Sequence, residues 1–524
     1  MNASKKAAGA ILFISLLTFL SRILGFGREI VLAKYFGLSD MRGAFTVAFK
    51  IPNLIRTLLT DTAISAAFLP VFTDLVVQNR KDEAYHVSSS IINISVIILT
   101  TIVIVCSLFM PYVVTLCAPG FTDDPILFKE TSSLSVIIFP TLILFAVSGV
   151  LVGMLNSYSH FTAPSVGPLL WNIIIIIIVM SFWKEIGIES AAWGILIGTF
   201  AQFVILIKPL KDLGVKYYFT IDFQNPSVRR VFKLILPVTL SLGIINFNVF
   251  VDTMFASFLG PRSVAAIDSA FRIFHMPMGI FAVAIGTVLF PVLSKFSSEK
   301  ENTKFSNTLE TGIGQIFYLT VPCACIFFVL ANPVVSLVFE RGNFTSDDTV
   351  FVAKALIFFS IGLPFSSANT LLNRGFYSLK NNWTPLYVGL INIFLNALLD
   401  WILMQKYGHA GICFSTSLVS TFNFFALLLL IKKKTSINIK NILFSFSKIF
   451  TLSMFVTLTA YAMFNWLNGM ISGKINNTLL LLTIIFFSST LYIIITSALK
   501  IRESEIAVEL FNKVRRKTSK DSNI

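Results

Sequence analysis

Four basic side chains occur inside apolar stretches of the chain, where a charge is costly. Arg22 and Arg28 follow the apolar run 11–20, and Lys50 and Arg56 lie within a second apolar stretch. A charge at membrane depth costs several kcal/mol, so it faces protein or water and usually serves a function. Arginines that converge in a cavity form a forked donor set suited to phosphate or carboxylate. Near helix ends, such residues can instead extend to the lipid headgroups.

Helix-disturbing residues lie beside these charges. Gly25 and Gly27 precede Arg28, and Pro52 precedes the polar Asn53. Breaks of this kind free backbone polar groups, which membrane helices tolerate where they line a cavity. The sequence therefore predicts irregular helices around an anion-binding cavity.

The composition is that of a membrane protein. Of the 524 residues, 55% are hydrophobic and only 13% are charged, and phenylalanine occurs 53 times. A net charge of +15 would suggest nucleic acid in a soluble protein, but here the basic residues lie mostly in short loops, as the positive-inside rule describes. We therefore expect no nucleic-acid partner. The five cysteines favour a buried structural role, and no cleavable signal peptide is expected.

Apolar runs of membrane-spanning length predict an all-α polytopic membrane protein with 14 transmembrane helices. The runs lie at about 8–36, 42–70, 87–112, 131–155, 164–183, 190–210, 230–259, 264–294, 309–331, 350–378, 384–405, 410–431, 446–467 and 477–499. An even number places both termini on one side, and the basic loops place that side in the cytoplasm.

An internal repeat organises these helices. Ala48-Phe49-Lys50-Ile51 returns 222 positions later as Ala270-Phe271-Arg272-Ile273, and Gly120-Phe121-Thr122-Asp123-Asp124 returns within 342–348. A six-helix unit thus occurs twice, and because six is even the two copies have the same orientation, related by an axis along the membrane normal. Two such lobes indicate alternating access at the cleft between them.

The repeat divides the chain into four parts. We expect an N-lobe at 1–212, a C-lobe at 213–432, two further helices at 433–500 and a basic cytoplasmic tail at 501–524. Arg272 would then face Lys50 and Arg56 across the cleft. Such a strongly positive cavity predicts an anionic cargo, and the guanidinium fork favours a phosphate group. Asp61, Asp268 and His275 lie nearby in sequence and are candidates to hold an arginine in place.

A second group of residues has the chemistry of a cation site. Asn396 and Asp400 are four residues apart, hence on one helix face, and Asp252 and Thr416 lie in other apolar runs. Carboxylate, amide and hydroxyl oxygens inside a helix bundle suit a hard cation. Alternatively, Asp400 is simply solvated near a helix end. The sequence contains no nucleotide-binding glycine loop, so transport would draw on an ion gradient, the membrane potential or a substrate gradient.

Several stretches resemble the signatures of the MurJ/MviN lipid II flippases of the multidrug/oligosaccharidyl-lipid/polysaccharide exporter superfamily. They are Ser21–Glu29, Phe49–Arg56, Ala118-Pro119-Gly120-Phe121 and Gly375-Phe376-Tyr377-Ser378. The resemblance covers essentially the whole chain. It implies a transporter, not an enzyme, that exports the undecaprenyl-pyrophosphate-linked peptidoglycan precursor (lipid II) from the inner to the outer leaflet of the bacterial cytoplasmic membrane, for cell-wall synthesis and cell shape.

The resemblance also implies roles for particular residues. The substrate-binding set would be Arg22, Arg28, Asn53, Arg56 and Arg272. A possible sodium site would comprise Asp252, Asn396, Asp400 and Thr416, since some members carry such a site. The helices of 433–500 would form a groove for the lipid tail. The expected partners are lipid II and membrane lipids, and we expect the protein to work as a monomer.

Two positions depart from the family pattern. Many members carry an acid just before the alanine that is Ala44 here, where this chain has Gly43, and others carry a glutamate where this chain has His275. These departures bear on gates built from arginine–carboxylate pairs. As a hypothesis, Asp40 or Asp268 supplies the carboxylate that such a gate would lack here.

Three alternatives remain open from the sequence. An ion-coupled multidrug or other polyprenyl-linked oligosaccharide exporter has the same architecture, although a cavity for cationic drugs would be acidic or aromatic. A membrane scaffold with an inactive transport fold would tolerate loss of Arg28 or Arg272. A prenyl-pyrophosphate enzyme would need an acid-rich metal-binding motif, and none is visible in the sequence.

Overall fold

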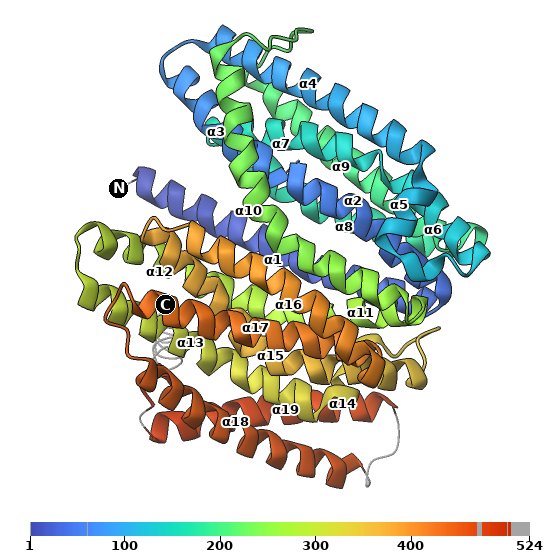
Figure 1. The fold of residues 1–524 in the computed structure, drawn as a ribbon, viewed down its shortest axis with the longest axis vertical. Helices are drawn as coiled ribbons and strands as arrows, with labels where there is room; N and C mark the ends of the chain where they lie inside the picture. Colours follow the sequence, from blue (N-terminus) through green and yellow to red (C-terminus); the bar gives the residue numbers. More distant parts are fainter. Residues whose placement is uncertain (1, 60, 469–473, 500, 505–524) are drawn as a thin grey trace, which may run out of the picture. The chain divides into compact units, whose positions relative to one another are not determined.

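The structure is a computed structural model that describes residues 2–59, 61–468, 474–499 and 501–504, and every regular element in these ranges is a helix (Figure 1). The helices are α1 (Asn2–Phe36), α2 (Asp40–Leu59), α3 (Asp61–Val77), α4 (Lys81–Leu108), α5 (Met110–Cys117), η1 (Pro119–Phe121), α6 (Pro125–Ile138), α7 (Thr141–Ser157), α8 (Thr162–Ile186), α9 (Glu189–Asp212), α10 (Pro226–Ser257), α11 (Pro261–Pro277), the π-helical η2 (Met278–Ala282), α12 (Val283–Ser298), α13 (Asn302–Val329), α14 (Ala331–Phe339), α15 (Ser346–Ser378), α16 (Trp383–Tyr407), α17 (His409–Lys432), α18 (Ile439–Asn468), α19 (Lys474–Ala498) and η3 (Arg502–Ser504).

The helices confirm a multi-pass, all-helical membrane protein. Within the described residues, 11 stretches are long and apolar enough to cross a membrane, and each coincides with one of the predicted spans. The other three predicted spans, 8–36, 42–70 and 230–259, fall on α1, on α2 with α3, and on α10. The count of fourteen stays a prediction. Residues 505–524, most of the predicted basic tail, lie outside the described residues.

The chain forms two compact units. The first comprises Met1–Ala266 with Phe339–Asp348, and the second comprises Ile267–Val338 with Thr349–Ile524. In the first unit, α10 packs against α2 and α3, α1 packs against α8, and α8 runs beside α9. Phe68, Phe72 and other buried side chains of α3, α4, α7 and α9 form its apolar core. This packing holds α1 and α2, which carry most of the candidate site, in a fixed relation.

The second unit has its own core. It is built on α13, which packs against α12 and α18, while α18 packs against α19. Phe317 and Phe424 are fully buried there, with their ring centroids 5.6 Å apart. The hydroxyl of Tyr492 donates to the backbone oxygen of Tyr318 at 3.1 Å, which ties α19 to α13. The predicted helices of 433–500 therefore pack on the body of this unit.

The predicted helix irregularities at Gly25, Gly27 and Pro52 are wrong. Both α1 and α2 are continuous through these residues. Glycine in a helix interior costs about 1 kcal/mol, a penalty that packing can offset, and α1 packs along α8. A Cβ at Gly25 would lie 3.7 Å from the side-chain amide of Asn172, an ordinary contact, so this glycine lies directly against α8.

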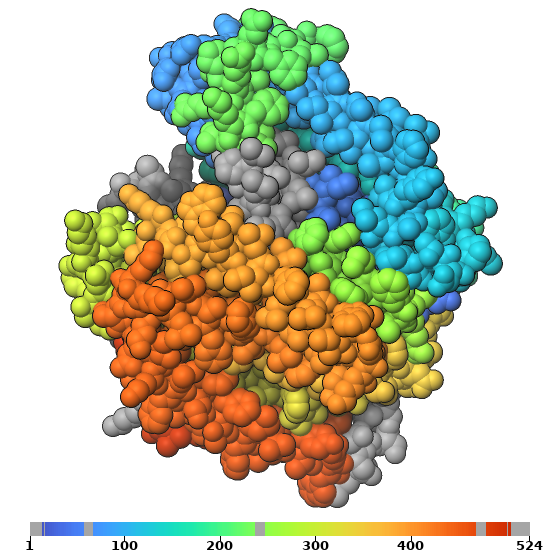
Figure 2. Space-filling model, in the orientation of Figure 1, coloured from blue at the N-terminus to red at the C-terminus, as the bar shows by residue number. Residues whose placement is uncertain are grey.

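The segment between α9 and α10 is held against α4. The side-chain amide of Asn93 donates to the backbone oxygens of Tyr218 and Thr220, at 3.2 and 2.8 Å. The hydroxyl of Ser89 accepts from the backbone N–H of Tyr218, and the ring of Tyr218 stacks on His86. Figure 2 shows this part of the first unit in green beside the light-blue surface of α4. The connection between the two repeat copies is therefore an ordered part of the first unit.

Candidate functional site

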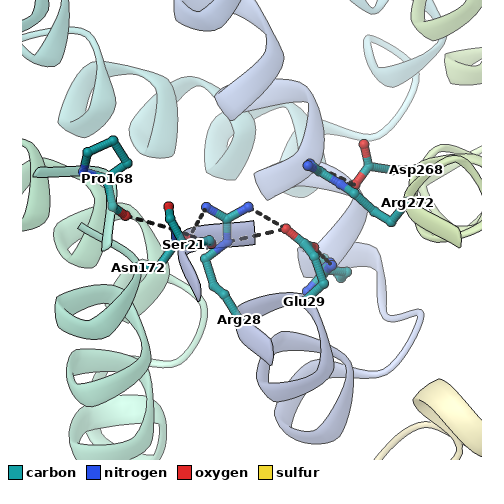
Figure 3. A network of polar contacts seen from close by, with 8 residues as sticks. Ser21, Arg28, Glu29, Pro168, Asn172, Asp268 and Arg272 are labelled. Atoms are coloured by element: carbon teal, nitrogen blue, oxygen red, sulfur yellow. Dashed lines mark hydrogen bonds and ion pairs between the residues drawn. The ribbon is translucent and has the colours of Figure 1, made fainter. Parts of the chain in front are cut away.

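Arg28 lies at the centre of a buried polar network in the first unit (Figure 3). Its side chain is 9% exposed, and its Nη2 is 2.6 Å from Oε1 of Glu29. Nη1 donates to Oδ1 of Asn172 on α8 at 3.3 Å. The Asn172 amide in turn donates to the backbone oxygens of Pro168 and Ser21, so it cannot rotate freely. The predicted arginine thus lies inside the protein, with its orientation fixed by α8.

An aromatic ring covers the other face of the guanidinium. The Cζ of Arg28 lies 4.8 Å from the ring centroid of Trp171, a cation–π contact. The indole N–H of Trp171 donates to the hydroxyl of Thr199 on α9 at 3.1 Å. This bond orients the ring, so α8 and α9 together position the charge on α1.

Sequence reasoning missed the most buried cation of the site. Arg42 on α2 is 3% exposed, and its Nη2 is 2.9 Å from Oε2 of Glu29. One carboxylate therefore holds two guanidinium groups, one through each oxygen, and the three groups carry a net charge of +1. The signal was present in the sequence, because Arg42 is also a charge beside an apolar run and stands at the first position of the predicted span 42–70.

The structure also explains the departure at Gly43. A Cβ at this position would lie 2.4 Å from the backbone oxygen of Pro261, so no larger residue fits without a backbone shift. An acid is therefore excluded at position 43 in this conformation. Glu29 is the carboxylate that pairs with Arg28 and Arg42. Asp40, one of the two hypothetical substitutes, is exposed at the start of α2.

Lys50 and Asn53 line a small cavity between α2 and α10. The Nζ of Lys50 donates to the hydroxyl of Thr253 at 3.1 Å. The cavity has a volume of about 40 Å³, and its wall includes Cys117 and Phe250. That volume holds water but no sugar or peptide group. In this conformation the polar face of α2 is closed against α10.

The other two arginines predicted for the site in the first unit have different surroundings. Arg56 is half-buried, with its Cζ 4.4 Å from the ring centroid of Phe145 on α7. Arg22 is exposed, although it lies on the same helix as the buried Arg28. The two residues are six positions apart, which is less than two helical turns and brings them to different faces.

Arg272 lies in the second unit and has a carboxylate partner of its own. Its Nε and Nη2 are each 3.4 Å from Oδ2 of Asp268, one turn earlier on α11 (Figure 3). The Arg272 side chain is 33% exposed and that of Asp268 10%. His275 is exposed, with its ring 5.4 Å from that of Phe271. The side chain of Asp61 lies outside the described residues.

Two of the four candidate cation ligands are brought together. Asn396 and Asp400 on α16 are 1% and 0% exposed, and the Asn396 amide donates to Oδ2 of Asp400 at 3.1 Å. The hydroxyl of Ser415 on α17 donates to the backbone oxygen of Asn396. Asp400 is therefore not solvated at a helix end. Thr416 bonds to the backbone oxygen of Ile412 in its own helix, and Asp252 belongs to the first unit.

The chain is similar in sequence to known lipid II flippases. A family model described as lipid II flippase MurJ matches residues 32–503. A probable lipid II flippase MurJ from Buchnera aphidicola subsp. Schizaphis graminum is 31% identical over 513 residues, covering 96% of this chain and 99% of the relative. The lipid II flippase MurJ of Burkholderia cenocepacia is 28% identical over 431 residues, covering 81% and 84%.

Solved structures agree with the sequence relatives. A structure of lipid II flippase MurJ in an inward closed conformation has a TM-score of 0.80 and 28% identity, covering 93% of this chain and 98% of that one. An inward-facing multidrug transporter of the MATE family has a TM-score of 0.67 at 14% identity, over 79% and 94%, which shows a shared fold alone. The chain belongs to the lipid II flippase MurJ family.

Proposed function

We propose that this protein moves lipid II from the inner to the outer leaflet of the bacterial cytoplasmic membrane by alternating access, and so supplies peptidoglycan synthesis. Two observations support this function: the family match over 32–503 and the buried arginine network on α1 and α2. The network is the observation that carries it, because an arginine-rich polar centre in a membrane-spanning fold suits an anionic lipid headgroup. The protein has fourteen spans in two six-helix lobes and two added helices, with both termini in the cytoplasm, and works as a monomer.

The geometry supports an exchange of partners at Arg28. Glu29 neutralises one of the two arginines that it contacts, so the group keeps one positive charge for a pyrophosphate. When Arg28 turns from Glu29 to a phosphate oxygen, Arg42 still holds the carboxylate. Glu29 is therefore never left buried as an unpaired charge, which would be strongly unfavourable. Arg22, Asn53, Arg56 and Arg272 complete the headgroup site in this proposal.

The lipid tail stays in the membrane while the headgroup crosses. We assign the tail to the surface of α18 and α19, where Phe455, Leu458, Phe486 and Phe487 are exposed apolar side chains. Burial of such surface against an acyl chain is favourable at about 25 cal/mol per Å². The headgroup and tail sites thus use different chemistry on different helices.

A coupling cation is part of the proposal. The buried carboxylate of Asp400 and the amide oxygen of Asn396 are hard donors that fit Na⁺. Asp252 and Thr416 would complete the ligand set. A sodium gradient would then drive the cycle through the second unit.

Complementation tests the function. A strain depleted of its own lipid II flippase is supplied with wild type, Arg28→Ala, Arg272→Ala or Lys433→Ala, with membrane levels checked for each. Lys433 is an exposed lysine outside the site and serves as the matched loss of one positive charge. Growth with wild type and Lys433→Ala, and none with the two arginine variants, is the expected result. No rescue by well-expressed wild type would refute lipid II as the cargo.

A multidrug exporter is the weaker candidate. The likeness to MATE transporters, at 14% identity, is one of fold. The polar centre on α1 and α2 contains two arginines for each carboxylate, which repels a cationic drug.

A further inference from the structure

Two loops of the first unit touch the ends of α10 and α1 so closely that only glycine fits. The loop after α5 contacts the last residues of α10 through Gly120. A Cβ at Gly120 would lie 2.3 Å from the backbone oxygen of Ser257 and 2.5 Å from Cα of Phe258. The backbone N–H of Gly120 also donates to the hydroxyl of Ser257 at 3.1 Å.

The loop after α14 makes a matching contact with the end of α1. A Cβ at Gly342 would lie 2.3 Å from the backbone oxygen of Lys34, and Gly342 has φ +62°, a value that favours glycine. The next residue, Asn343, donates its backbone N–H to the Lys34 oxygen at 2.8 Å. Its side-chain amide donates to the backbone oxygen of Tyr35 at 2.6 Å.

The two contacts correspond in the repeat to within one residue. Gly120 and Gly342 are 222 positions apart, which is the offset of the repeat. The same offset relates Ser257 to Tyr35, the residue after the contacted Lys34, and Tyr35 accepts from the side chain of Asn343. Each loop thus binds the end of the first helix of the other repeat copy. We call this reciprocal pair, Gly120 on Ser257 and Gly342 on Lys34, the glycine clasp.

Two further contacts lie beside the glycine clasp. Gly43 near the start of α2 lies against Pro261 at the start of α11. The helices α2 and α11 are also related by the repeat. The Nη2 of Arg262 is 2.8 Å from Oδ1 of Asp348, in the first turn of α15, directly after the second clasp loop. These residues lie in the last turns of α1 and α10, at the starts of α2, α11 and α15, or in the two loops that contact those helix ends. They therefore lie on the membrane face opposite the start of α1.

We infer that the glycine clasp is the outer gate of the transporter. This inference rests on the proposed function, which makes the face opposite the N-terminus the exit side. The closed clasp brings backbone against backbone, and the cavity beside it, at Cys117, has a volume of about 40 Å³, too small for a headgroup. Release of cargo requires both loops to leave the helix ends. Because the two contacts are repeat-related, they open as a symmetric pair.

Labelling of Cys117 tests the inference. Cys117 ends α5, three residues before Gly120, and is 7% exposed. In cells that express the full chain with its other four cysteines changed to alanine, a membrane-impermeant maleimide is added from outside. Gly120→Ala and Gly342→Ala open the clasp, and labelling of Cys117 rises about tenfold or more, because the open state is otherwise a minor population. Unchanged labelling in both variants would overturn the inference.

Gly187→Ala is the matched control. Gly187 has φ +56°, close to that of Gly342, but a Cβ there would meet nothing within 4 Å. It reproduces the backbone strain without touching the clasp, and its labelling rate should equal that of the parent chain. If the labelling rate of Cys117 rises equally in Gly187→Ala and Gly342→Ala, the rise comes from general loosening of the protein, and the gate is overturned.

A covalent lock gives a second test that survives poor folding of the glycine variants. The double variant Tyr35→Cys with Asn343→Cys places two thiols at this contact, where the Asn343 side chain donates to the backbone oxygen of Tyr35 in the native chain. Oxidation that forms this disulfide should stop growth in the complementation strain, and a reductant should restore it. Growth that continues with the disulfide formed would overturn the gate while leaving lipid II transport intact. Changed Cys117 labelling in a chain that does not complement would instead support the gate and refute the cargo.

Discussion

Glu29→Gln should destabilise the protein more than the loss of either arginine that it holds. The substitution keeps the shape of the side chain and removes its charge. It leaves Arg28 and Arg42 as two buried cations that share one neutral amide. Their side chains are 9% and 3% exposed, so water cannot solvate the charges that Glu29 now balances.

The magnitude follows from the geometry. With Nη–Oε separations of 2.6 and 2.9 Å, each pair attracts by about 6 kcal/mol at an effective dielectric constant of about 20. Part of this offsets desolvation, and removing one partner of a buried pair costs about 3–5 kcal/mol in practice. Arg42→Gln leaves the Arg28–Glu29 pair neutral and loses about 1.5–3 kcal/mol, the range for a hydrogen bond to a charged group.

The double variant makes the test sharp. Glu29→Gln with Arg42→Gln contains one buried cation instead of two, so it should be more stable than Glu29→Gln alone. The midpoint of thermal unfolding of the purified protein in detergent, followed by intrinsic fluorescence, ranks the variants. The expected order of stability is wild type, Arg42→Gln, the double variant, then Glu29→Gln.

One result would refute the reasoning. If the double variant is less stable than Glu29→Gln, the two substitutions add as independent losses, and Glu29 does not act by balancing charge. Arg230→Gln, at an exposed arginine paired with Asp74, is the control for a surface ion pair and should change stability by less than about 1 kcal/mol.

Three further outcomes are expected. Asn93→Leu leaves the backbone oxygens of Tyr218 and Thr220 without their donor, and should lower the free energy of unfolding by about 1–3 kcal/mol and speed proteolysis between α9 and α10. Tyr492→Phe removes the hydroxyl that donates to the backbone oxygen of Tyr318 on α13. It should lower the free energy of unfolding by about 1 kcal/mol, measured by the same thermal unfolding. Wild type should unfold at a higher temperature in NaCl than in choline chloride, and Asp400→Asn should abolish that difference, because a ligand stabilises only the state that binds it.

The helices were predictable because span length and apolarity are local properties of the sequence. Eleven predicted spans coincide with helices that meet both criteria. The continuity of α2 through Pro52 was not predictable in this way. A proline removes one backbone hydrogen bond, and the packing of α2 against α6 and α10, which keeps the helix intact, depends on distant parts of the chain.

The site was predictable in its charges and not in its partners. Arg28 was found because an arginine in an apolar run is costly. Asn172, which orients it, is 144 positions away, and only the packing of α1 on α8 brings the two together. Glu29 is adjacent to Arg28 in sequence, yet its role depends on Arg42, thirteen positions on, which reaches it across the turn between α1 and α2.

The membership of Phe339–Asp348 in the first unit has a consequence for protein made in two pieces. The chain crosses from one unit to the other three times: after Ala266, after Val338 and after Asp348. A single cut in the 213–225 segment therefore does not release one unit from the other. A C-terminal fragment that begins in that segment still carries Phe339–Asp348, which binds the end of α1, and α10, which packs on α2 and α3. The two halves, when co-expressed, should therefore associate without a covalent link. They should co-purify and reconstitute the transporter.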